Sequence, residues 1–324
     1  MKSNESGPEN HFFSGLLFFC KKTDKIKKTC ILVLLLLMKE NLMKEKMSLS
    51  TEISWKNQIF VAVDLETTGA YPLSAEICEI GAVKWQNGKV IGDFQSLVKP
   101  EKPIPSEIIA IHNISNQMVA GAPSIEKVLP DFRNFLDGAY LVAHHAPFDM
   151  GFLAYEFENS GLSFPENPVF CSSLYSRKMI PECPNHKLQT LVNFLDLPKR
   201  QAHRALSDAQ SCMDVLVKCF DRVTGASEVG DLLKVQPKQL VWRNFSIQEI
   251  QGKENIKPLI EGIQQAKPVR IIYKGGSSPG RSRVVEPIGI VRSPDGDFLA
   301  AREQGFEKVK RYYLSRIDQS ELSL

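Results

Sequence analysis

Residues 59–69 read IFVAVDLETTG, an apolar run followed by two closely spaced carboxylates. Ile59–Val63 suits a strand that is buried on both faces and ends at Asp64. Side chains two positions apart on a strand point the same way, so Asp64 and Glu66 share one face while Leu65 turns into the core. We therefore expect two carboxylates to face one pocket at the end of a buried strand.

Two later clusters carry the same kind of side chain. Asp149 lies in HHAPFD, and His203 and Asp208 lie in HRALSD. Each cluster also has a simpler interpretation. Asp-x-Glu suits a solvated turn, Asp149 suits the start of a helix over Met150–Glu158, and a histidine on a helix running to about Phe220 often only packs or decorates the surface. Their occurrence together predicts a metal-dependent nuclease, because two divalent cations about 4 Å apart need several converging carboxylates.

The three clusters resemble the three exonuclease motifs of the DEDDh group in the DnaQ-like (RNase T) superfamily, which includes the proofreading subunits of bacterial replicative polymerases. The resemblance spans about residues 58–220. It includes IHNISNQMVAGAPS within residues 104–135 and NHKLQTLVNFLDL before the third cluster. A sister group has tyrosine four residues before the last aspartate, where this chain has Arg204. The resemblance implies an α/β fold with a ribonuclease-H-like mixed sheet flanked by helices.

This resemblance implies a role for each acidic residue and for the histidine. Asp64, Glu66, Asp149 and Asp208 would bind two Mg²⁺ or Mn²⁺ ions, and His203 would be the general base of a 3′→5′ exonuclease. An imidazole has an unperturbed pKa of about 6.5, so near neutral pH it can take a proton from the attacking water. The spacing agrees, because five residues on a helix separate two side chains by about 140° and let them border one site.

Further residues of the motifs are expected to contact the substrate. Leu65 resembles an apolar wedge at the terminal nucleotide, and Thr67 with its neighbour Thr68 would meet the 3′ end through backbone and hydroxyl groups. Phe148 either fills the core or lies against a base. His145 stands where the family commonly has asparagine, and we expect it to act structurally or in substrate contact.

The last part of the chain has a β-like pattern. Strands are predicted at residues 269–273, 284–291, 298–301 and 309–314, separated by GGSSPG, SPDGD and EQG turns. The segments VRIIYKG, RVVEPIGIV, DFLAAR and RYYLSRI resemble successive strands of the WYL domain, an Sm-like β module. The name-giving Trp-Tyr-Leu is replaced by Asp297-Phe298-Leu299. We expect a small Sm- or SH3-like β-barrel or a strongly bent sheet, which would bind nucleic acid or a nucleotide-like ligand.

Positive charge is concentrated in this C-terminal segment. Between Lys267 and Arg316 there are eleven basic and five acidic residues, a net charge of +6, against +3 for the whole chain. Arg283, Arg302 and Arg316 are predicted to contact nucleic acid, with aromatic residues available for stacking on bases. A solvated basic face over core aromatic residues would give the same pattern.

Length and composition suit a globular protein with two compact units. The chain has 324 residues, of which 43% are hydrophobic and 24% charged. Its seven cysteines form no Cys-x-x-Cys pair, which favours reduced thiols and a cytoplasmic location. The apolar run at residues 31–38 is too short to span a bilayer, so no membrane contact is expected. The expected divisions are a disordered or non-native extension (1–46), an exonuclease domain (55–223), a helical connector (224–266) and a WYL-like domain (267–324).

These patterns together predict an exonuclease that releases nucleotides from single-stranded 3′ ends, with DNA favoured over RNA. A DNA polymerase or repair proteins are the expected protein partners. Two alternatives stay open: an RNA 3′ exonuclease, because discrimination depends on contacts with the 2′-hydroxyl, and a nucleic-acid-binding or ligand-sensing regulator that uses the nuclease fold as a scaffold. All five active-site positions are filled, which argues against the regulator.

Overall fold

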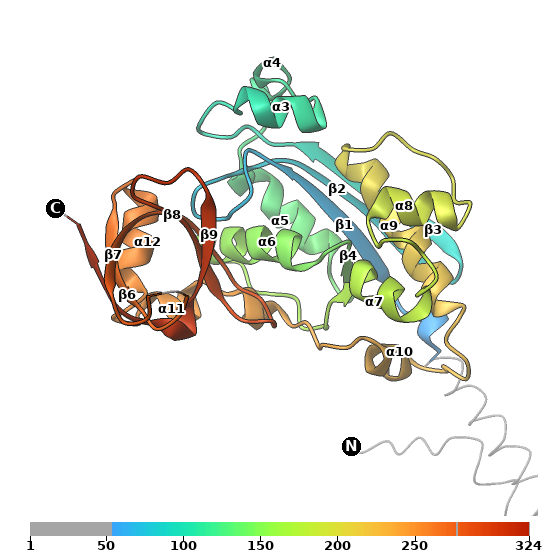
Figure 1. Cartoon of the computed structure of the whole chain (residues 1–324). Coiled ribbons are helices and arrows are strands. Elements are labelled where there is room, and N and C mark those ends of the chain that lie inside the picture. Colours follow the sequence, from blue (N-terminus) through green and yellow to red (C-terminus); the bar gives the residue numbers. More distant parts are fainter. Residues whose placement is uncertain (1–53, 277, 324) are drawn as a thin grey trace, which may run out of the picture. The chain divides into compact units, whose positions relative to one another are not determined.

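The computed structural model describes residues 54–276 and 278–323 (Figure 1). The predictions for residues 1–46 lie outside these ranges. Within them, no helix combines the length and the apolar character needed to cross a membrane.

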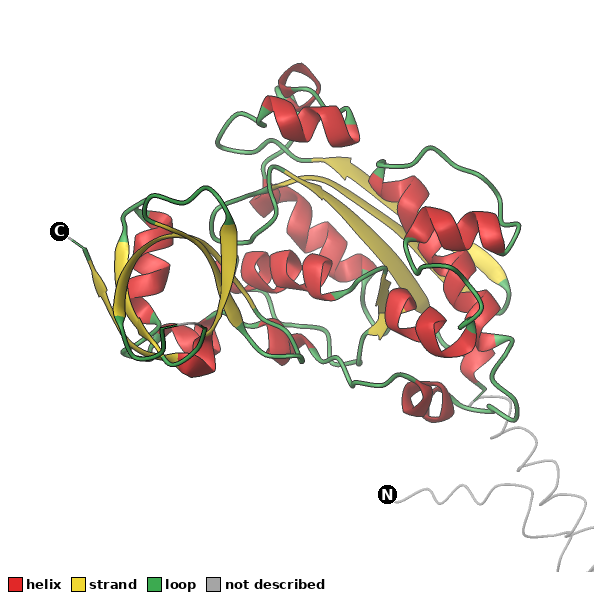
Figure 2. Cartoon of the chain, in the orientation of Figure 1, coloured by secondary structure: helices red, strands yellow, loops and turns green. Residues whose placement is uncertain are grey.

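The first sheet has five strands in the order β3-β2-β1-β4-β5 (Figure 2). β1 (Phe60–Thr67) lies at the centre, antiparallel to β2 (Ile77–Gln86) and parallel to β4 (Tyr140–Ala143). The edges are β3 (Lys89–Leu97), antiparallel to β2, and β5 (Phe170–Cys171), parallel to β4. The expected ribonuclease-H-like mixed sheet is therefore confirmed.

β1 is longer than its apolar run predicts. Its pairing with β2 continues as far as Thr67, with a shift of register between Glu66 and Thr67. The prediction that the strand ends at Asp64 is wrong, because the main-chain ladder continues past the last apolar residue. Asp64 and Glu66 still lie on one face, while Leu65 is 4% exposed and packs in the core.

Helices cover both faces of this sheet, and the alternation of β1 explains why both faces are apolar (Figure 1). Val61 and Val63 pack in one core with residues of α5 and α6, whereas Phe60 and Ala62 pack in a second core with residues of α7, α8 and α9. The bounds are α5 (Ile125–Phe135), α6 (Pro147–Asn159), α7 (Ser172–Met179), α8 (Leu188–Phe194) and α9 (Ala205–Phe220). The predicted helix after Asp149 is confirmed as α6.

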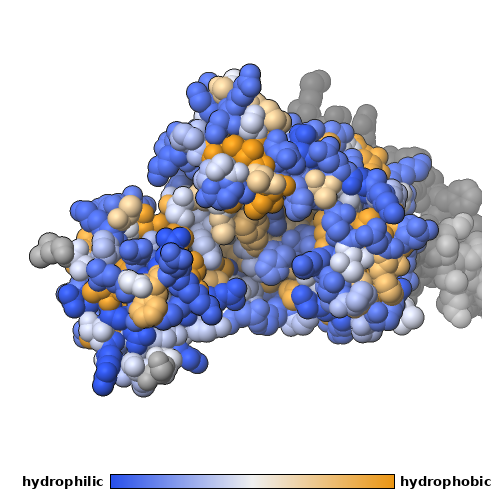
Figure 3. All heavy atoms as spheres, turned by 45° about the horizontal axis from the view of Figure 1, so that its top comes forward, coloured by the Kyte–Doolittle hydropathy of each residue, from blue (hydrophilic) through white to orange (hydrophobic). Residues whose placement is uncertain are grey.

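Two short helices, α3 (Ser106–His112) and α4 (Asn116–Val119), lie between β3 and α5. They expose Ile111 and Met118. Figure 3 shows apolar residues gathering around this segment, above a hollow in the face drawn there. This face therefore has a hollow with an apolar rim.

Short helical elements occupy the chain between α9 and the C-terminal sheet. These are α10 (Val229–Val235), η2 (Trp242–Phe245), α11 (Gln248–Gln251) and α12 (Lys257–Gln264). Pro258 stands at the start of α12, where a missing N–H costs nothing. Leu259, Ile260 and Ile263 of α12 pack into the core of the C-terminal sheet.

The C-terminal sheet has five antiparallel strands in the order β10-β6-β7-β8-β9. Their bounds are β6 (Val269–Tyr273), β7 (Ser282–Val291), β8 (Phe298–Glu303), β9 (Val309–Tyr313) and β10 (Ile317–Leu322). The predicted β-strands form one sheet, but this sheet does not close into a barrel. The one-turn η3 (Leu314–Arg316) carries the chain from β9 to β10, and these two strands form opposite edges of an open, curved sheet (Figure 2).

Candidate active site

Asp64 lies in the middle of a group of carboxylates. Burial raises the pKa of Asp64 well above its usual range, and the charges of Asp149, Asp208, Glu66 and Glu79 raise it further. Burial, with Asp208 and Glu79, also raises the pKa of Glu66 to about 8. The structure thus brings together carboxylates from all three sequence clusters, and their mutual repulsion favours the binding of cations.

Asp149 reaches this group from the first turn of α6. It is 2% exposed, and its Oδ1 accepts the backbone N–H of Leu65 at 3.2 Å. Burial raises the pKa of Asp149 to about 8 even though this hydrogen bond favours the charged form. The bond joins the second sequence cluster directly to β1.

His203 does not lie on helix α9, which begins at Ala205. Its φ of 60° is in the left-handed region, and Arg204 is extended. The prediction that His203 and Asp208 share one helix is therefore wrong. The chain turns back instead, so that the His203 N–H donates to Asp208 Oδ2 at 2.8 Å, while Gln189 donates to Asp208 Oδ1 at 3.2 Å.

The side chains of Glu66, His203 and Asp208 nevertheless converge. Each offers a ligand atom, and these atoms all lie within 4.8 Å of one another. The two carboxylates are buried, whereas the imidazole is exposed. Buried carboxylate oxygens beside further carboxylates are a donor set that suits Mg²⁺ or Mn²⁺, so the residues present fit the cations that the sequence predicts.

A buried ion pair, which the sequence did not predict, holds the start of α9 against β2. Glu79 is fully buried, and its carboxylate accepts hydrogen bonds from the Arg204 guanidinium at 2.8 and 3.2 Å and from the Ala205 N–H at 3.1 Å. Burial alone would raise the pKa of Glu79, but these hydrogen bonds keep it below its usual value. The available signal was a glutamate inside the apolar run Ile77–Val83.

Gly81 permits this close approach of helix and sheet. A Cβ at Gly81 would lie 2.0 Å from the backbone nitrogen of Leu206 and 2.2 Å from the carbonyl carbon of Ala205. Any side chain at this position would displace the backbone of α9. Gly81 and Glu79 therefore place the turn that carries His203.

The predicted threonines lie at the end of β1 and in the turn after it. Thr67 Oγ1 donates to the carbonyl of Gly69 at 2.7 Å, and Thr68 Oγ1 accepts the N–H of Glu76 at 2.9 Å. Thr67 is 7% exposed. Both hydroxyls therefore have partners within the protein, as does the N–H of Thr68, which donates to the Glu76 carbonyl at 2.8 Å.

Phe148 and His145 flank the start of α6. Phe148 is partly buried against the core, with its ring 5.2 Å from that of Phe152. His145 is exposed, with a φ of 64°. The surrounding protein and the cationic side chains of Arg177 and Arg311 lower its pKa. Arg311 belongs to β9, so the C-terminal sheet reaches the neighbourhood of this site.

The strand pairing places Arg311 on an exposed surface of the C-terminal sheet. Phe298 and Arg302 of β8 alternate with core residues, as do Arg311 and Tyr313 of β9, and they share the surface opposite α12. The Arg311 guanidinium lies 4.9 Å from the centre of the Phe298 ring, and that of Arg316 lies 5.7 Å from the Tyr313 ring. These five residues form the β8–β9 face.

The three arginines predicted in this sheet differ in their surroundings. Arg302 and Arg316 are exposed. Arg283 is partly buried; it donates to the carbonyl of Ser278 at 2.7 Å and lies 5.9 Å from the Tyr273 ring. The structure therefore brings Arg302 and Arg316 to the β8–β9 face and keeps Arg283 apart from it.

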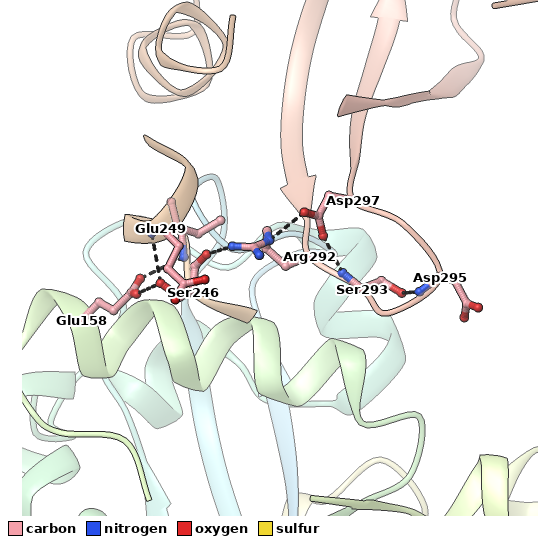
Figure 4. Close-up of polar contacts among 8 residues, drawn as sticks. Glu158, Ser246, Glu249, Arg292, Ser293, Asp295 and Asp297 are labelled. Carbon is pink, nitrogen blue, oxygen red and sulfur yellow. Dashed lines mark hydrogen bonds and ion pairs between the residues drawn. The ribbon is translucent and has the colours of Figure 1, made fainter. Parts of the chain in front are cut away.

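A chain of polar contacts connects α6 to the C-terminal sheet (Figure 4). Glu158, near the end of α6, accepts the N–H of Ile247 at 3.0 Å and the hydroxyl of Ser246. The carbonyl of Ser246 accepts a hydrogen bond from Arg292, whose Nε lies 2.9 Å from Asp297 Oδ2. Helix α6 therefore supplies Asp149 from its first turn, and its last turn is connected to the C-terminal sheet through Ser246 and Arg292.

Comparison with known families gives two matches. The family described as "Exonuclease" matches residues 61–216, and the family described as "WYL domain" matches residues 254–322.

Individual relatives are similar to part of the chain. "DNA polymerase III PolC-type" of Caldanaerobacter subterraneus is 38% identical over 215 residues, which cover 64% of this chain and 15% of that protein. The protein of the same name from Halalkalibacterium halodurans is 40% identical over 152 residues, covering 47% and 11%. The chain therefore spans only a small part of these relatives. "Exonuclease X in complex with 5′ overhanging duplex DNA" is 26% identical, with a TM-score of 0.44, covering 55% of this chain and 99% of that one.

Proposed function

We propose that this protein is a metal-dependent 3′→5′ exonuclease acting on single-stranded DNA. Residues 61–216 match the exonuclease family and residues 254–322 match the WYL domain family. The observation that carries the proposal is the meeting of Asp64, Glu66, Asp149 and Asp208 in one buried group. The relatives named as DNA polymerases favour DNA over RNA. Their names also suggest a polymerase as a partner.

The four carboxylates would hold two Mg²⁺ or Mn²⁺ ions. Such ions, when bound, neutralise charge that develops on the oxygens of the scissile phosphodiester. Asp64 and Glu66 are fixed by the β1 ladder, Asp149 by its hydrogen bond to the Leu65 N–H, and Asp208 by the His203 N–H. The carboxylate oxygens that would bind the ions are thus held in place before the substrate arrives. This lowers the reorganisation that the reaction needs.

His203 would act as the general base. Its imidazole is exposed and lies beside Glu66 and Asp208, so it can accept a proton from water at the edge of the carboxylate group. The left-handed turn and the Glu79–Arg204 ion pair fix its backbone. Water then attacks the terminal phosphodiester, and a mononucleotide leaves without a covalent intermediate.

Leu65, Thr67, Thr68, Phe148 and His145 would surround the 3′-terminal nucleotide. Leu65 packs in the core and Thr67 is almost fully buried, so these two would act mainly through their backbone and the shape of the β1 end. The exposed ring of His145 is free to meet the sugar–phosphate backbone.

The β8–β9 face would carry the strand that leads into the site. It combines arginines, which bind phosphates, with Phe298 and Tyr313, on which bases can stack. Arg311 is close enough to His145 for its charge to lower the pKa of that residue. The strand could therefore pass directly from this face to the carboxylates.

The proposal is tested by incubating the full chain with end-labelled single-stranded DNA, duplex DNA and single-stranded RNA, each with Mg²⁺ or Mn²⁺. We expect stepwise shortening of single-stranded DNA from its 3′ end, slower action on RNA, and no reaction in chelator. Arg311→Ala should raise the KM for long strands more than for dinucleotides, whereas exposed Lys89→Ala, on β3, serves as the charge-matched control. Products that shorten from the 5′ end would overturn the proposal.

A further inference from the structure

A second group of acidic residues surrounds a cavity that the proposed reaction does not use. The cavity has a volume of about 320 Å³ and is bordered by the β1–β2 connection, the residues after β3, the start of α5 and the end of α6. Glu76, Glu101, Glu126 and Glu156 line it, one from each of these segments. None of the four is a predicted ligand of the catalytic cations.

Glu156 lies in this cavity without a partner of opposite charge. Its side chain is only 9% exposed, yet in the described ranges its carboxylate takes part in no hydrogen bond or ion pair. The rim lysines Lys99 and Lys102 are exposed, and neither forms an ion pair with a described acidic residue. A buried carboxylate normally has a donor, because burial without one is costly. The side chain therefore faces space that a cationic group could fill.

Two neighbouring carboxylates accept hydrogen bonds from nearby groups. Glu76 accepts the backbone N–H groups of Glu101 at 2.5 Å and Lys102 at 3.3 Å. A hydrogen bond from the Ser124 side chain lowers the pKa of Glu126. Glu156 therefore shares the cavity lining with three further acidic side chains.

The charge of Glu156 responds to these neighbours. Burial raises the pKa of Glu156 to about 7, and Glu126, Glu76 and Glu101 add to the rise. A bound cation would reverse this effect by offsetting the repulsion, so that Glu156 becomes fully ionised on binding.

The size of the cavity and the spacing of its carboxylates distinguish between kinds of cation. In the part of the chain that the structure describes, Glu66, His203 and Asp208 offer three ligand atoms that lie within 4.8 Å of one another. The described glutamates of the cavity form no such group. In the arrangement described, these glutamates are therefore spaced more widely than the Glu66, His203 and Asp208 group. The walls also include apolar Leu73, which suits methylene groups.

We propose that this cavity binds an organic cation whose primary ammonium group is carried on a methylene chain, with Glu156 and Glu76 as its anionic partners. The ammonium group would pair with the carboxylates and the methylene groups would lie on the apolar wall. Either a free polyamine or a lysine side chain of another protein offers this chemistry.

The proposal is tested by calorimetric titration of the full chain with spermidine and, separately, with a short lysine-containing peptide. Excess Mg²⁺ is present throughout, so that the active-site carboxylates do not compete for the ligand. We expect at least one of the two ligands to bind at pH 8, with affinity falling as the pH drops below 7. Glu156→Gln, which preserves shape, should weaken binding at least about tenfold. Exposed Glu166→Gln should bind like the unaltered protein.

Each outcome bears on the proposal. Binding of spermidine alone identifies a free polyamine, and binding of the peptide alone identifies a protein side chain; either supports the shared chemistry. Absence of binding by both, or equal affinity in Glu156→Gln, would overturn it. If Glu156→Gln fails to fold, Glu76→Gln, at the second proposed partner, replaces it, with the same weakening expected.

Discussion

Replacing Glu79 with glutamine tests how the structure holds its third sequence cluster. The substitution keeps the size of the side chain but removes the charge that pairs with Arg204. In the unaltered protein, donors from Arg204, Ala205 and Gln95 share the two carboxylate oxygens of Glu79. In the variant, the same donors would have a single carbonyl oxygen as their acceptor. The amide NH₂ would point at groups that are themselves donors.

The size of the effect follows from burial. The Glu79 side chain is 0% exposed and that of Arg204 is 28% exposed. Removing one partner of a buried ion pair costs about 3–5 kcal/mol, because the other charge is left unpaired. Water can reach part of the Arg204 guanidinium, so we expect a loss of about 2–4 kcal/mol in the free energy of unfolding.

Urea unfolding of the metal-free chain measures this loss as a shift of the midpoint. The matched control is Glu182→Gln, which removes an ion pair of 2.6 Å to Arg222 on the surface. We expect that control to leave the midpoint almost unchanged, because exposed pairs contribute little. The nuclease rate of Glu79→Gln should fall further than its stability explains, since His203 depends on the same turn. Equal midpoints for the two variants would refute the reasoning.

Three further predictions concern other parts of the account. Gly81→Ala should lower stability by about 1–3 kcal/mol in the same assay, because its Cβ meets the α9 backbone, whereas Gly121→Ala, which has open space around it, should show only a small change. Metal-free protein should lose stability as the pH rises from about 5 to 8, because Glu66 and Asp149 have folded-state pKa values of about 8 and give up their protons more easily when unfolded. Between these pH values each group lowers the free energy of unfolding by about 1.4 kcal/mol per pH unit. Added Mn²⁺ should raise the thermal midpoint more at pH 8 than at pH 6. A free energy of unfolding that does not change with pH would contradict this prediction. Arg292→Met should speed proteolysis of the connector without altering cleavage of dinucleotides, and unchanged proteolysis would show that the contact with Ser246 does not hold the C-terminal sheet.

Local patterns in the sequence were sufficient for the central strand and for α6. The apolar run before Asp64 and the proline at the start of α6 are signals contained in a few neighbouring residues. The position of His203 was not predictable in the same way. α9 begins at Ala205 because Glu79, more than a hundred residues earlier, accepts the Ala205 N–H, and no local pattern around His203 reports that contact.

The C-terminal sheet shows the same distinction. Val269–Tyr273 was predicted with its observed bounds because β-branched and aromatic residues occupy four of its five positions. β10 was missed, since Asp318, Gln319 and Glu321 are exposed and only its pairing with β6 makes it a strand. The openness of the sheet and the approach of Arg311 to His145 depend on tertiary packing, which strand patterns do not contain.

The most direct test of the central claim compares the unaltered chain with Asp64→Asn on a 5′-labelled DNA strand in Mg²⁺. The claim is that carboxylates from three distant segments act together on the 3′ end. It predicts stepwise shortening of the strand by the unaltered chain and loss of this activity in Asp64→Asn, with the variant folded at the same temperature. Equal shortening by both proteins would contradict it.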